Sequence, residues 1–78
     1  SVFKRPPGHY AGALVESAGC KGMRVGGVEV SRKHANFIVN LGNGEASDVL
    51  RLIDEVRHRV WEYAHVVLEP EVIVRGEL

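Results

Sequence analysis

Residues 47–64 carry the clearest pattern of apolar and polar positions in the chain. Apolar residues recur three or four positions apart there, so that a helix would bring them onto one face. They are Val49, Leu52, Ile53, Val56, Val60 and Tyr63. Most polar residues fall on the opposite face, namely Arg51, Asp54, Glu55, Arg57, His58 and Glu62. With Ser47 as a suitable N-cap, the pattern predicts a long amphipathic helix that buries one face.

A second, shorter helix is predicted over residues 10–19. Apolar residues again have helical spacing, at Ala11, Leu14, Val15 and Ala18. Gly19 stands where a helix commonly ends in a left-handed residue. Gly12 would cost such a helix about 1 kcal/mol relative to Ala, which a close backbone contact would explain.

The remaining segments predict strands and turns. Residues 23–30 alternate loosely and predict a strand, in which Gly26 and Gly27 indicate a bulge or the close approach of another chain or a ligand. Residues 37–40 predict a short buried strand, and residues 66–78 predict one or two strands around Pro70. The few helices and hairpin-length gaps favour an α+β fold, with a small mixed sheet packed against one long amphipathic helix and one short helix.

Composition narrows the class of protein. The chain has 78 residues, ten of them Lys or Arg and ten Asp or Glu, so it is expected to form one domain without the basic excess of a nucleic-acid-binding protein. Its apolar runs are too short to span a membrane. The single Cys20 excludes an intrachain disulfide and fits a cytoplasmic location, and the four histidines lack the spacing of a metal site.

Three motifs then point to a family. Residues 1–8 read SVFKRPPG, residues 21–40 read KGMRVGGVEVSRKHANFIVN, and residues 68–72 read LEPEV. In order and with compatible spacing, they resemble characteristic stretches of the UDP-N-acetylenolpyruvoylglucosamine reductase family. The resemblance covers essentially all of the chain and corresponds to the C-terminal, substrate-binding domain of that family.

The resemblance implies an activity for the full-length protein. Such a reductase passes hydride from NADPH through FAD to the enolpyruvyl ether of UDP-N-acetylglucosamine enolpyruvate, and so makes UDP-N-acetylmuramic acid for peptidoglycan. The FAD lies in two preceding domains of the same polypeptide. Residues 1–78 are therefore expected to be a single C-terminal domain without flavin-binding domains, with neither FAD nor NADPH bound, and inactive alone.

The resemblance also implies two catalytic residues. Ser1 matches the serine that protonates the substrate carbon next to the carboxylate. An unperturbed hydroxyl is a poor acid, so the site must stabilise its alkoxide or relay a proton to it. Glu71 matches the second catalytic residue, and a carboxyl group there could assist proton delivery. Glu69, on the other side of Pro70, does not match.

Four further residues are candidates for binding substrate. Lys4 and Arg5 suit a diphosphate, which Arg can bind through two hydrogen bonds. The resemblance places His34 at a position associated with contact to the substrate nucleotide, and it implies that Arg24, with Gly26 and Gly27, helps to shape the substrate pocket. Taken without the motifs, each of these residues is an ordinary solvated side chain.

Two other functions stay open. The chain could be a non-catalytic nucleotide-sugar binding module, or a small interaction domain that uses the charged face of its long helix. Ser1 and Glu71 in one pocket would favour the enzyme domain over both.

Overall fold

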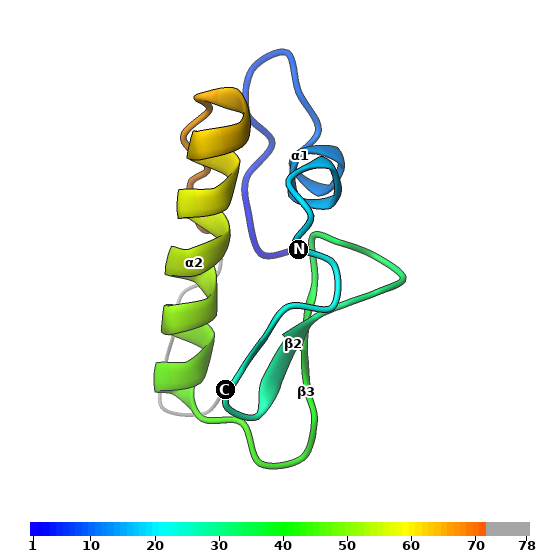
Figure 1. Ribbon diagram of the computed structural model, residues 1–78, viewed down its shortest axis with the longest axis vertical. Coiled ribbons are helices and arrows are strands. Elements are labelled where there is room, and N and C mark those ends of the chain that lie inside the picture. The colour runs from blue at the N-terminus through cyan, green and yellow to red at the C-terminus, as the bar shows by residue number, and fades with distance from the viewer. Residues whose placement is uncertain (72–78) are drawn as a thin grey trace.

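The computed structural model describes residues 1–71, which form two helices and a three-stranded sheet. In chain order the elements are α1 (Ala11–Ser17), β1 (Arg24–Val25), β2 (Val28–Val30), β3 (Ile38–Asn40) and α2 (Ala46–Ala64). Figure 1 shows α2 along one side of the molecule, with α1 and the sheet on the other. The predicted α+β class and both predicted helices are confirmed. Neither helix is long and apolar enough to cross a membrane.

The sheet has the order β1-β2-β3, and each described pair is antiparallel rather than mixed. The connections explain this, because hairpin-length loops cannot make the crossover that parallel strands need. Residues 23–30 are not one bulged strand, since Gly26 and Gly27 form the turn between β1 and β2. Gly26 has a φ of 54°, which two-residue hairpin turns favour. The turn places Arg24 opposite Glu29.

The prediction that residues 37–40 are buried is wrong. Phe37 and Val39 are exposed, and Ile38 between them is half-buried against the core. β3 is one of the two outer strands of the described sheet, and α2 packs on β1 and β2. One face of β3 therefore has nothing to cover it among residues 1–71.

Helix α2 buries the predicted stripe except at its ends. Leu52, Ile53, Val56 and Val60 are buried, whereas Tyr63 is exposed. The N-cap is Glu45 instead of Ser47. Glu45 and Asp48 form a capping box, in which the side chain of each residue accepts a hydrogen bond from the backbone amide of the other. The predicted ion pair of Glu55 and Arg59 is present at 3.1 Å.

The core lies between α2, α1 and the inner face of the sheet. Its largest fully buried side chains include Leu52, Leu68, Val15 and Val60. In Figure 1 the first residues of the chain, in blue, run between α2 and α1. Of the one or two strands expected over residues 66–78, residues 66–71 show only a single antiparallel bridge between Phe3 and Pro70, and residues 72–78 lie outside the described part of the chain.

Candidate functional site

The two ends of the described chain lie side by side and are joined by backbone hydrogen bonds. The amide of Lys4 donates to the carbonyl of Glu69 at 2.8 Å, and the amide of Glu71 donates to the carbonyl of Val2 at 2.7 Å. Phe3 and Leu68, one on each segment, are buried in the core. The apolar side chains thus anchor both segments, and the backbone bonds fix their register.

This pairing brings Ser1 and Glu71 together. The Oγ of Ser1 donates a hydrogen bond of 2.8 Å to Oε2 of Glu71, a usual length for an O–H···O bond. Both side chains are exposed, so a ligand could reach them. A hydroxyl in contact with a carboxyl group can pass on a proton and receive another, which an isolated serine cannot do.

Asn36 holds the first segment from a different side, and sequence reasoning missed it. The amide of Phe3 donates to Oδ1 of Asn36 at 2.9 Å, and Nδ2 of Asn36 donates to the carbonyl of Phe3 at 3.1 Å. The amide of Val2 also donates to the backbone carbonyl of Asn36 at 2.9 Å. Asn36 lies in a polar turn, a setting in which Asn is ordinary, so no signal in the sequence marked it.

Lys4 and Arg5 line a hollow of about 340 Å³ together with Pro6, Pro7, Val67 and Glu69. The guanidinium carbon of Arg5 lies 4.1 Å from the centre of the Tyr10 ring, a cation–π contact. Its Nε also donates to the carbonyl of His9 at 3.3 Å. Two cations therefore border a cavity next to the segment that carries Ser1.

Arg24 is held by a carboxylate that sequence reasoning did not single out. Its Nε lies 2.6 Å from Oε2 of Glu29, and Nε of Arg32 lies 3.8 Å from the same oxygen. Glu29 is only 7% exposed. A two-residue turn at Gly26 and Gly27 would have placed Arg24 opposite Glu29 and is the signal that could have found this pair.

His34 is exposed in the turn between β2 and β3. Its backbone amide donates to Oγ of Ser31 at 3.1 Å, and its ring meets the Phe37 ring edge-on, with centroids 5.9 Å apart. His34 stands two residues before Asn36, whose side chain binds the segment that carries Ser1. Among residues 1–71, the hydrogen bonds link Ser1 to Glu71 but link neither Arg24 nor His34 to that pair.

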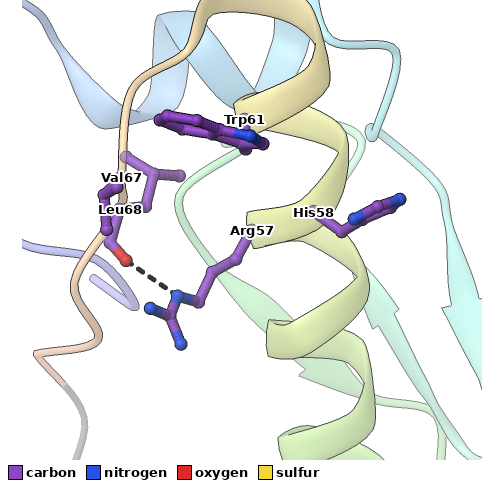
Figure 2. Close-up of a pocket in the computed structure, with 5 residues that line it drawn as sticks. All are labelled: Arg57, His58, Trp61, Val67 and Leu68. Atoms are coloured by element: carbon purple, nitrogen blue, oxygen red, sulfur yellow. Dashed lines mark hydrogen bonds between the residues drawn. The ribbon is translucent and has the colours of Figure 1, made fainter.

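A second groove, of about 330 Å³, contains none of the predicted site residues. It is lined by Arg57, His58, Trp61, Val67 and Leu68. Figure 2 shows Arg57 and Trp61 leaning toward the segment of Val67 and Leu68, and His58 pointing away from it. The Nε of Arg57 donates to the carbonyl of Leu68 at 2.9 Å. Arg57 therefore ties α2 to the segment that leads to Glu71.

A strand, a glycine-containing loop and a helix N-terminus can together bind the pyrophosphate of a flavin dinucleotide, and the loop between β3 and α2 has this arrangement. Oδ2 of Asp48 accepts hydrogen bonds from the amides of Glu45 and Gly27, at 3.1 and 3.3 Å. Two acidic side chains thus cap this helix end, and their charge would repel a pyrophosphate. The loop does not fit the group.

No three His, Cys, Asp or Glu side chains of residues 1–71 are grouped so as to hold a metal ion. Burial raises the pKa of the Cys20 thiol, which makes it a poor nucleophile.

Comparison with known proteins agrees with the motifs. The family model described as "UDP-N-acetylenolpyruvoylglucosamine reductase, C-terminal domain" matches residues 1–75. The chain belongs to this family. UDP-N-acetylenolpyruvoylglucosamine reductases from Rubrobacter xylanophilus and Moorella thermoacetica are 61% and 57% identical to it over 77 residues, which are 99% of the chain and 26% of each relative.

A solved structure resembles the domain as well. The crystal structure of UDP-N-acetylenolpyruvylglucosamine reductase from Thermus caldophilus matches with a TM-score of 0.75 and 47% identity, over 92% of this chain and 25% of that one. The reductase C-terminal domain predicted from the motifs is thereby confirmed, and the chain spans about a quarter of the length of these relatives.

Proposed function

We propose that this domain supplies the proton in the reduction of the enolpyruvyl ether of UDP-N-acetylglucosamine, as part of a cytoplasmic reductase of peptidoglycan synthesis. FAD, bound by the rest of such a polypeptide and reduced by NADPH, would supply the hydride. The observation that carries the proposal is the 2.8 Å hydrogen bond between Ser1 and Glu71. It unites, across the whole domain, the two residues that the family motifs mark as catalytic.

The proposed roles follow from the chemistry of the two groups. After hydride adds to one alkene carbon, the other carries the charge of an enolate and needs a proton. The Ser1 hydroxyl would donate that proton to carbon, and the adjacent Glu71 carboxyl group would relay a proton from solvent to the serine oxygen. The relay avoids an alkoxide beside a carboxylate, which would be strongly unfavourable.

Substrate binding is assigned to the cations around the hollow. Lys4 and Arg5 border it and would bind the diphosphate oxygens, with Arg5 oriented by its contact with Tyr10. His34 and Arg24 stay secondary candidates for substrate contact, Arg24 because Glu29 already pairs with its guanidinium.

The test uses the whole reductase that contains this domain, followed by stopped-flow absorbance in its two half-reactions. Ser1→Ala and Glu71→Gln should leave flavin reduction by NADPH unchanged, because that step involves no proton transfer to the sugar substrate. Reoxidation of the reduced flavin by the enolpyruvyl substrate should slow by about 10²–10⁴-fold. The matched variant Glu69→Gln should keep the reoxidation rate at saturating substrate.

The hollow also supports the second function, a nucleotide-sugar binding module without chemistry, and the same experiment separates the two. If Ser1→Ala enzyme reoxidises at the normal rate while Arg5→Ala weakens binding, the domain binds substrate but does not supply the proton. The proposed proton relay would then be wrong.

A further inference from the structure

The carboxamide of Asn36 takes the place of a neighbouring strand for the segment that carries Ser1. It accepts from the amide of Phe3 at 2.9 Å and donates to the carbonyl of Phe3 at 3.1 Å, the two bonds that a paired strand residue would exchange with it. We propose that Asn36 is a positioning residue, which fixes the Ser1 hydroxyl against Glu71. The inference rests on the proposed function, since it assigns Asn36 to the reaction through Ser1.

The opposite side of the segment does not supply this support at Phe3. Phe3 lies opposite Pro70 as a non-hydrogen-bonded pair, so its amide and carbonyl point away from residues 69–71 and toward Asn36. On that side the Lys4 amide donates to the carbonyl of Glu69, and the Val2 carbonyl accepts from the amide of Glu71. Asn36 therefore provides both side-chain hydrogen bonds that reach the Phe3 backbone, two positions from Ser1.

The geometry needs an amide side chain in particular. A carboxamide offers a donor and an acceptor in one plane, whereas a carboxylate offers acceptors alone. Phe3 is only 3% exposed, so its amide and carbonyl would not readily find water in place of Asn36. Without the carboxamide the segment should shift, and a displacement of about 1 Å in a reacting group can cost on the order of 10²-fold in rate.

The structure offers a matched control in Asn40. Its Oδ1 accepts from the amides of Gly42 and Gly44 at 2.8 and 3.0 Å, and its Nδ2 donates to the carbonyl of Gly44 at 3.3 Å. Asn40→Ala thus removes the same carboxamide and a similar set of backbone bonds, but from the loop before α2. A stability effect alone would appear in both variants.

The experiment compares Asn36→Ala and Asn40→Ala in the whole reductase with bound flavin. Asn36→Ala should reduce the rate of flavin reoxidation at saturating enolpyruvyl substrate by about 10- to 100-fold and leave reduction by NADPH unchanged. Asn40→Ala should leave both rates unchanged. Asn36→Asp, which keeps the acceptor for the Phe3 amide, should fall between Asn36→Ala and the unmodified enzyme and provides a second variant if Asn36→Ala folds poorly.

A double variant tests whether Asn36 acts through Ser1. In a Ser1→Ala background, Asn36→Ala should slow reoxidation little further, because the group that it positions is already gone. An independent slowing in that background, or a normal rate in both single Asn36 variants, overturns the positioning role. If Ser1→Ala slows flavin reoxidation but the Asn36 variants reoxidise at the normal rate, the positioning role is wrong and the proposed function still holds. If Ser1→Ala itself reoxidises at the normal rate, both are wrong.

Discussion

The hydroxyl oxygen of Ser1 lies 2.8 Å from Oε2 of Glu71, although 70 positions separate the two residues in the chain. The contact depends on a register that backbone bonds set on either side of Phe3 and Pro70. Changes far from Ser1 can therefore alter it, if they loosen either segment.

Arg57 makes one such connection, from α2 to the carbonyl of Leu68 at 2.9 Å (Figure 2). Arg57→Ala should lower the free energy of unfolding by about 1.5–3 kcal/mol, the range for a hydrogen bond from a charged donor. Arg51→Ala, at an exposed position of the same helix, should change it by less than about 0.5 kcal/mol. Urea denaturation monitored by the Trp61 fluorescence measures both. Equal losses would show that the bond to Leu68 contributes nothing.

Val56 lies at the middle of the buried stripe of α2 and is 1% exposed. Val56→Asp should cost several kcal/mol, because it leaves a carboxylate without a partner in the core. Leu50→Asp is the control, since Leu50 is 52% exposed on the same helix and should tolerate the charge. Thermal unfolding followed by circular dichroism compares the two. A larger loss at Leu50 would mean that the wrong face of α2 is buried.

Two glycines should respond to alanine in opposite ways. A Cβ at Gly27 would overlap the backbone of Asn43 and Gly44, so Gly27→Ala should destabilise by about 1–3 kcal/mol. A Cβ at Gly12, inside α1, would meet Asn36 Cβ at an ordinary 3.7 Å. Gly12→Ala should therefore stabilise the chain by about 0.5–1 kcal/mol. Denaturation midpoints measured under one set of conditions decide both signs.

Acid should weaken the cap of α2. Backbone hydrogen bonds from Glu45 and then Gly27 lower the pKa of Asp48 in the folded state. A carboxyl group whose pKa is lowered by folding contributes stability above its unfolded pKa, about 4, and loses it as the pH falls through the folded-state value. Asp48→Asn should thus be less stable than the unmodified chain at pH 7, by a margin that shrinks below pH of about 4.

The control for this pH dependence is Asp54→Asn, an exposed position on α2. Its urea midpoint should follow that of the unmodified chain from neutral to acid pH. A margin between Asp48→Asn and the unmodified chain that stays constant over this range would contradict the role of the charge.

The strongly periodic parts of the fold could be predicted from the sequence, and the parts set by single residues could not. The apolar stripe of α2 is enough to define its buried face. The N-cap depends on single residues, and it is Glu45 because Asp48 completes a capping box with it. Burial of residues 37–40 was predicted from their composition alone. That composition does not reveal that α2 packs on β1 and β2 and leaves one face of β3 uncovered in the described part of the chain.

The candidate site divides in the same way. Ser1 and Glu71 could be named from motif resemblance, and their contact follows from pairing over the longest sequence separation in the site. Asn36 could not be predicted from the sequence, because its role depends on the contact between the turn that contains it and Phe3, which is 33 positions away in the chain. The Arg24–Glu29 ion pair could have been predicted from the sequence if Gly26 and Gly27 had been interpreted as a turn instead of a bulge.

The pairing of residues 2–4 with 69–71 also has a consequence for synthesis on the ribosome. Ser1 emerges long before Glu71, and closing so long a loop is among the slower contacts for a small domain to make. A nascent chain that has not reached Leu68 lacks both the core residue and the partner that would position the serine. The contact between Ser1 and Glu71 therefore cannot form until nearly the whole domain has been translated, so that a prematurely terminated product would carry Ser1 without Glu71.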